Sequence, residues 1–113
     1  MKHVIHSASL GLLLAALTAT SYAAMNADDI AAAQSAFTNN GCSGCHNATE
    51  TVVGPALSAI AQRYQGKNAE AEMAGRIRGG STGRWGNAMH PANESIDPAD
   101  ASLLAKWILN GAP

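Results

Sequence analysis

The chain contains two cysteines, and both lie in the pentapeptide Cys42-Ser43-Gly44-Cys45-His46. This spacing is typical of a site at which haem is attached covalently. On a helical turn the two thiols share one face, so each can form a thioether with a vinyl group of the porphyrin. His46 follows Cys45 directly, and its imidazole can reach the iron from the same side. We therefore predict one covalently bound haem, with His46 as an axial ligand.

Two other kinds of site use a similar cysteine spacing. A thioredoxin-like redox disulfide lies in a βαβ unit, but no part of this sequence alternates apolar and polar residues convincingly as a strand does. A structural zinc ion normally takes four ligands, often from two paired motifs. Beyond the N-terminal segment the chain offers Cys42, Cys45, His46 and His90, without a second paired spacing. Both alternatives fit the sequence less well than haem.

Residues 1–23 have the features of a secretory signal peptide. Lys2 precedes an apolar stretch from Leu10 to Leu17, and Ser21-Tyr22-Ala23 forms a small-x-small cleavage signal. An uncleaved anchor is the competing interpretation, but a membrane span needs roughly 20 mostly apolar residues, and threonine and serine dilute this run. We expect cleavage after Ala23 to leave a single domain, residues 24–113, in the periplasm without stable membrane insertion.

The charge of the predicted mature chain is close to neutral. Without Lys2, six basic residues face eight acidic ones, a formal charge of −2. A nucleic-acid-binding protein would show a strong basic excess on one face, so we expect no nucleic-acid partner. The few lysines also exclude a lysine ring around a docking site. We expect a monomer that meets its partners through a mostly uncharged surface.

The rest of the sequence predicts an all-α domain of about four helices. Asn26, Asn68 and Asp97 are candidate N-caps, and Pro55 and Pro98 suit first helical positions. Apolar residues recur at helical spacing in each segment. The expected helices cover residues 26–40, 55–65, 69–78 and 97–110.

Between Gly79 and Ile96 lies an irregular segment that is long for so small a domain. Trp85 and Met89 need an apolar environment, which a loop wrapped over one haem face would provide. We predict Met89 as the second axial ligand, because a soft thioether favours ferrous iron and suits an electron carrier. Its neighbour His90 remains an alternative ligand or a group that modulates the potential. Met73, by contrast, shares a helix face with Ile77 and is expected in the core.

In the order and spacing of these elements, the chain resembles the small bacterial class I cytochromes c of the c-551/c-552 kind. The resemblance extends from about residue 27 to residue 110. The segments that carry it are Phe37 ahead of Gly41-Cys42 and the haem motif, Val53-Gly54-Pro55, Arg76-Ile77-Arg78-Gly79-Gly80, Trp85-Gly86, Met89, Pro91 and Leu104-Ala105-Lys106-Trp107.

This resemblance implies a small cytochrome c domain wrapped around one haem c, which is bound through Cys42 and Cys45. It further implies that the backbone around Pro55 supports the His46 imidazole, and that Arg76 and Trp85 hydrogen-bond a haem propionate. Phe37 and Trp107 would meet where the first and last helices cross. Two features differ from the family pattern: the stretch from Trp85 to Met89 is one residue shorter, and His90 replaces a common proline.

The expected function is one-electron transfer between respiratory redox partners, such as a respiratory complex and a terminal reductase or oxidase. No paired carboxylates, Ser-His-Asp order or phosphate-binding loop suggests independent catalysis, so we do not expect an enzyme. Two alternatives remain open. One is a haem enzyme or gas sensor with an open distal site, and the other is a haem subunit of a larger oxidoreductase complex.

Overall fold

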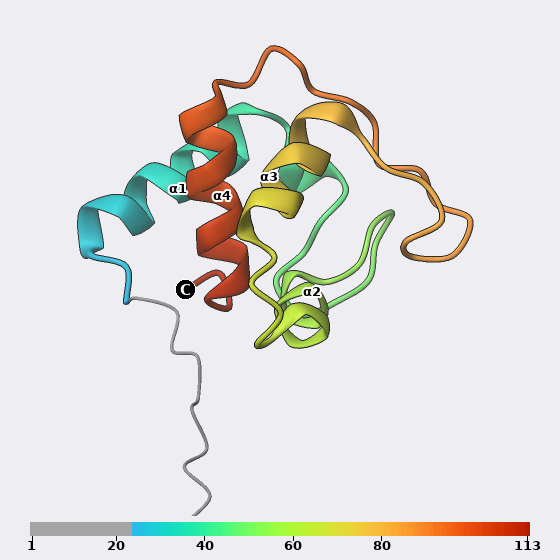
Figure 1. Ribbon diagram of the computed structural model, residues 1–113, viewed down its shortest axis with the longest axis horizontal. Coiled ribbons are helices and arrows are strands. Elements are labelled where there is room, and N and C mark those ends of the chain that lie inside the picture. Colours follow the sequence, from blue (N-terminus) through green and yellow to red (C-terminus); the bar gives the residue numbers. More distant parts are fainter. Residues whose placement is uncertain (1–23) are drawn as a thin grey trace, which may run out of the picture.

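The computed structural model describes residues 24–113, and every structural statement below concerns that part of the chain. It contains four α-helices and one 3-10 turn (Figure 1): α1 (Ala27–Asn39), η1 (Cys42–Gly44), α2 (Leu57–Tyr64), α3 (Glu70–Gly79) and α4 (Pro98–Leu109). Within residues 24–113 the only β pairing is two isolated bridges. The predicted all-α fold is therefore confirmed.

The predicted signal peptide lies outside the described residues, so the structure does not test it. None of the described helices is long and apolar enough to cross a membrane.

Helix α4 is the centre of the fold and contacts α1, α2 and α3. Leu104, Trp107 and Ile108, the apolar face expected from the sequence, are all buried. Ala101 and Ala105 are completely buried on the same helix, and their small side chains let the neighbouring helices approach closely. Figure 1 shows the other three helices arranged around this one.

The first and last helices meet through one aromatic pair. The ring centres of Phe37 and Trp107 are 5.4 Å apart and their planes are inclined by 59°, a favourable tilted arrangement. The indole Nε1 of Trp107 donates to the oxygen of Pro113 at 3.0 Å, and the side-chain nitrogen of Gln34 donates to the same oxygen at 3.0 Å. This contact confirms the packing role that the resemblance implied.

Two of the three predicted N-caps are confirmed. The Oδ1 atom of Asn26 accepts from the backbone N–H of Asp29 at 2.7 Å, and Oδ1 of Asp97 accepts from Ala99 at 2.8 Å. Pro98 occupies the first turn of α4, as expected. The prediction for Asn68 was wrong: this residue has a positive φ of 50°, and α3 begins after Ala69 without a side-chain cap.

The predicted start of α2 at Pro55 was also wrong, because the helix begins at Leu57. The backbone of Ala56 is extended, with a ψ of 143°. The N–H groups of Leu57 and Ser58 donate to the carbonyls of Asn47 and Ala48, at 2.9 Å and 3.0 Å. The segment that follows the haem motif therefore caps α2, and this long-range pairing leaves no local signal in the sequence.

Candidate functional site

Both cysteines lie on the short turn that follows α1. Gly41 enters it in the left-handed conformation, with a φ of 74°, which glycine adopts without steric cost. The backbone N–H groups of Cys45 and His46 both donate to the carbonyl of Cys42, at 3.1 Å and 3.0 Å. This geometry confirms the helical turn expected from the motif. Burial, together with the nearby Cys45, raises the pKa of the Cys42 thiol.

The next segment of the chain holds the ring of His46 in place. Its Nδ1 lies 2.8 Å from the carbonyl oxygen of Pro55. A carbonyl can only accept, so Nδ1 carries the proton and Nε2 keeps the lone pair that a metal requires. Gly54 lies against the same ring, since a Cβ at this position would be 2.6 Å from Cε1 of His46. Its N–H donates to the carbonyl of Cys45 at 2.8 Å, which holds this segment close to the motif.

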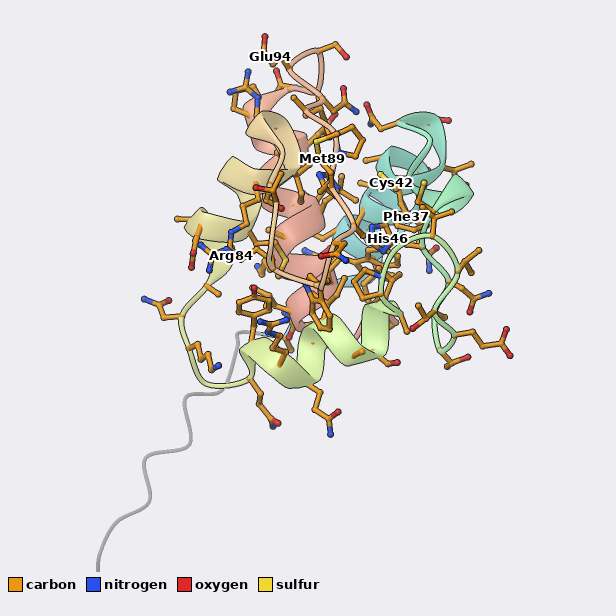
Figure 2. The ribbon with its side chains drawn as sticks, turned by 90° about the vertical axis from the view of Figure 1, so that its right-hand side faces the viewer. Phe37, Cys42, His46, Arg84, Met89 and Glu94 are labelled. Atoms are coloured by element: carbon orange, nitrogen blue, oxygen red, sulfur yellow. The ribbon has the colours of Figure 1, made fainter. Side chains whose placement is uncertain are left out.

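A single largely apolar cavity contains all the residues that the sequence analysis assigned to the cofactor. They come from the turn η1, the segment before α2, helix α3 and the loop between α3 and α4 (Figure 2). The cavity-lining residues predicted from the sequence are Cys42, Cys45, His46, Pro55, Arg76, Trp85 and Met89. Segments distant in the sequence are thus brought together at one site.

Several further residues that line the same cavity were not predicted from the sequence. Tyr64 on α2 is buried, and it follows Leu57 and Ile60 at helical spacing, so this pattern could have identified it. Met73 is buried in the core as predicted, but it also faces the cavity. It therefore places a second thioether at the site, besides that of Met89.

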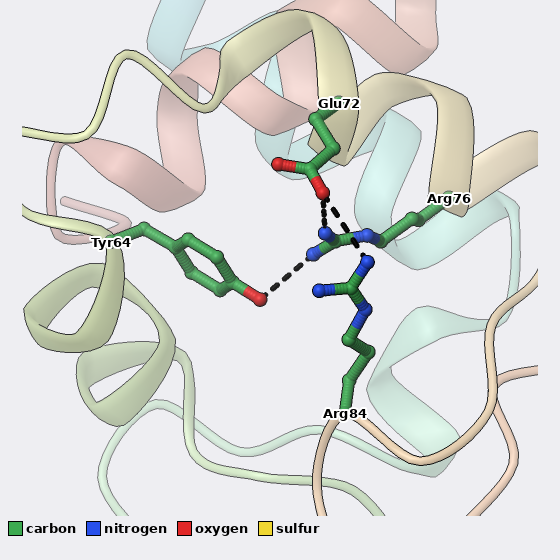
Figure 3. A network of polar contacts seen from close by, with 4 residues as sticks. All are labelled: Tyr64, Glu72, Arg76 and Arg84. Carbon is green, nitrogen blue, oxygen red and sulfur yellow. Dashed lines mark hydrogen bonds and ion pairs between the residues drawn. The ribbon is translucent and has the colours of Figure 1, made fainter.

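A polar network forms part of the cavity wall (Figure 3). Nη1 of Arg76 donates to the hydroxyl of Tyr64 at 2.7 Å, and Nη2 forms an ion pair with Glu72, one turn earlier on α3. Arg84, from the loop, approaches the same carboxylate at 3.5 Å. Two guanidinium groups thus share one carboxylate, which leaves an excess of positive charge beside the cavity.

Arg63 attaches the loop to α2. Its guanidinium lies 4.4 Å from the centre of the Trp85 ring, within the range of a cation–π contact. The same group donates to the carbonyl of Arg84. Trp85 is partly buried and packs against the hydrophobic core, so the loop is anchored at the edge of the cavity. The requirement for an apolar environment at Trp85 is thus met.

The two candidate distal ligands, Met89 and His90, differ in their surroundings. Both line the cavity, and Met89 as a whole residue is 70% exposed. The ring of His90 is half-buried, its centre lies 6.2 Å from that of His46, and its buried Nδ1 has no hydrogen-bond partner. Burial and the nearby His46 lower the pKa of His90. The inward position of His90 had no sequence signal beyond its departure from the family's proline.

The backbone of His90 is fixed by pairing with the segment that follows α3. Its N–H donates to the carbonyl of Ser81 at 2.8 Å, and its carbonyl accepts from Ser81 at 3.0 Å. Gly80 packs so closely that a Cβ there would be 2.8 Å from the His90 carbonyl oxygen. Gly80 also has a φ of 77°, so both its conformation and its surroundings favour glycine.

These residues fit a covalently attached haem. Two thiols and an oriented imidazole lie on an apolar cavity, guanidinium groups lie at its edge, and a buried ring nitrogen of His90 lacks a partner. Within residues 24–113, no group of three or more His, Cys, Asp or Glu side chains is placed to hold a metal ion alone. An all-α chain with this donor set has the features of a c-type haem protein.

Comparison with known proteins supports this assignment to the c-type haem proteins. The family described as cytochrome c matches residues 30–112, so the chain belongs to the cytochrome c family. It is similar to cytochrome c-552 of Nitrosomonas europaea (48% identity, 62% of this chain and 69% of the relative) and cytochrome c-551 of Pseudomonas aeruginosa (43%, 66% and 71%). The crystal structure of wild-type Nitrosomonas europaea cytochrome c552 superposes with a TM-score of 0.67 and 43% identity, over 69% of this chain and 98% of that one.

Within that family the protein is a small monohaem class I cytochrome c of the c-551/c-552 type. It has one covalent haem c and is a small electron-carrier cytochrome.

Proposed function

We propose that the protein is a periplasmic electron carrier that exchanges single electrons with a donor and an acceptor of the respiratory chain. Cys42 and Cys45 attach the haem, and His46 and Met89 bind the iron. When bound, the haem supplies a one-electron change between the ferrous and ferric states. The observation that carries the proposal is that both thiols, His46 and Met89 line one cavity.

Each of the surrounding residues has a positioning role in this proposal. The Pro55 carbonyl holds the imidazole of His46 with Nε2 available for iron, and Gly54 leaves room for the ring. Arg76 and Trp85 stabilise a haem propionate, a role supported by their positions on the cavity and by the excess of guanidinium groups beside it. Such contacts orient the ligands and tune the iron.

Electron transfer requires contact with partners but no chemical change in a substrate. Val52 is exposed, in the segment between the haem motif and α2, and its neighbour Val53 lines the cavity. An uncharged surface of this kind suits brief encounters with redox proteins, and the protein itself is proposed to be a monomer and not an enzyme. Association with a larger oxidoreductase complex would instead appear as co-elution with other subunits in size-exclusion chromatography of native extracts.

The first test is the absorption spectrum of the ferric protein. Ligation by a thioether gives ferric haem a weak band at the red end of the visible spectrum, and we expect this band in the parent protein. Met89→Ala should abolish it, because that variant lacks the proposed ligand. Met73→Leu is the matched control, since it removes the other thioether on the cavity and should leave the band unchanged. If the band disappears in Met73→Leu instead, Met73 is the ligand and the proposal for Met89 is wrong.

A haem enzyme or gas sensor with an open distal site is the second candidate. It would use the same cavity and the same proximal His46, but without Met89 bound to the iron. Carbon monoxide separates the two proposals, since an occupied sixth position blocks access to the iron. The electron-carrier proposal predicts little or no binding by the ferrous protein at neutral pH. Ready binding would support the sensor or enzyme.

A further inference from the structure

The ring of His90 has an unusual environment for a histidine with no assigned role. Its Nδ1 is buried and unpaired, although buried polar groups in folded proteins are nearly always hydrogen-bonded. The ring also lines the same cavity as His46. The protein thus encloses Nδ1, whereas Nε2 is not among the buried atoms and is the ring nitrogen that can meet a ligand in the cavity.

The separation of the two rings fits an iron as that ligand. Two imidazoles that bind one metal from opposite sides have ring centres roughly 6 Å apart, because each metal–nitrogen bond is about 2 Å long and each nitrogen lies about 1 Å from its ring centre. The centres of His46 and His90 are 6.2 Å apart, and their planes are inclined by 34°. The pair therefore has the separation that a single shared iron requires.

The backbone of His90 is firmly held. It is paired in both directions with Ser81 and packed against Gly80. Adjacent residues cannot both take the one remaining position on the iron. The loop thus presents two alternative donors, a thioether and an imidazole, at the same face of the cavity.

We propose that His90 is a second distal ligand, which binds the iron whenever Met89 does not. In the exchange the iron–sulfur bond to Met89 breaks and an iron–nitrogen bond to His90 forms. The neutral ring uses a lone pair, so neither an electron nor a proton is transferred. The inference rests on the proposed function in that it takes His46 as the proximal ligand. Because imidazole is a harder donor than a thioether, the exchange favours the ferric state.

The experiment compares Met89→Ala with the double variant Met89→Ala/His90→Ala, each isolated with haem attached. Electron paramagnetic resonance of the ferric proteins gives the spin state and the ligand type, and carbon monoxide binding shows whether the ferrous site is open. We expect Met89→Ala to remain low-spin with a bis-imidazole signal and to resist carbon monoxide. The double variant should become high-spin and bind carbon monoxide readily. Far-UV circular dichroism checks folding, and Met89→Leu, which retains an apolar side chain, replaces Met89→Ala if that variant does not fold.

The possible outcomes separate this inference from the proposed function. A high-spin Met89→Ala protein that binds carbon monoxide as readily as the double variant would overturn the role of His90, while a thioether band in the parent would leave the proposed function intact. If the parent lacks that band and His90→Ala alone converts it to high-spin, His90 is a ligand and the proposed His46/Met89 pair is wrong.

Discussion

Gly54 leaves the space that the ring of His46 occupies. A Cβ at residue 54 would be 2.6 Å from Cε1 and 3.0 Å from Nδ1 of that ring. Gly54→Ala must therefore shift the imidazole or the backbone, and it should weaken the hydrogen bond to Pro55. We expect the free energy of unfolding to fall by about 1–3 kcal/mol, the usual cost of overpacking. Denaturant titration followed by haem absorption measures it.

Gly75→Ala is the matched control for this substitution. Gly75 lies inside α3, and a Cβ there would meet nothing within 4 Å. Replacing a helical glycine with alanine should stabilise the protein by up to about 1 kcal/mol. Equal stability of the two variants would show that the space beside His46 is not restrictive.

At the scale of single residues, the sequence predicted only part of the cavity wall. The cysteine and histidine spacing located one side, and the length of the loop placed Trp85 and Met89 on the other. The orientation of His90 was not predictable, because its backbone pairing with Ser81 and its contact with Gly80 belong to an irregular loop without periodicity. The hydrogen bond from Arg76 to Tyr64 was equally hidden, since it joins two different helices.

Among the elements, α4 contributes most to the fold, and its start depends on one side chain. Asp97 accepts a hydrogen bond from Ala99 with its Oδ1. Asp97→Ala leaves that N–H without its partner, so we expect a loss of about 1 kcal/mol in the free energy of unfolding. Thermal or chemical unfolding measures the loss. Asp97→Asn retains an acceptor, so its loss of unfolding free energy should be only a small fraction of that of Asp97→Ala. Equal losses in the two variants would attribute the effect to the negative charge at the helix N-terminus.

Helix positions were predictable because apolar periodicity and caps are local signals. The exact starting residues of α2 and α3 were less predictable. Carbonyls of Asn47 and Ala48 replace a side-chain cap at α2, and the positive φ of Asn68 ends the turn before α3. The start of α2 therefore depends on how two separate segments meet, which short sequence patterns do not contain.

At the scale of the whole molecule, the cofactor completes a small core. Leu104 is the largest side chain in residues 24–113 that is fully buried, and many other apolar side chains line the cavity. Domains of this size are marginal without additional stabilisation. Cys42→Ala/Cys45→Ala cannot attach haem, so we expect it to lose the cooperative thermal transition of the parent, as measured by far-UV circular dichroism. Ser43→Ala, within the same motif, should retain that transition. An unchanged midpoint in the double variant would show that the helices pack without haem.

The turn that carries the two thiols closes through hydrogen bonds between near neighbours, from Gly41 to His46. None of the partners in these bonds lies in α4, so the turn does not require α4 in order to form. The chemistry that joins a porphyrin to Cys42 and Cys45 therefore does not need to wait for folding. We expect α4, the last helix in the chain, to close the cavity around a ring that is already bonded to the protein. The cofactor would then serve as a template on which the later helices assemble.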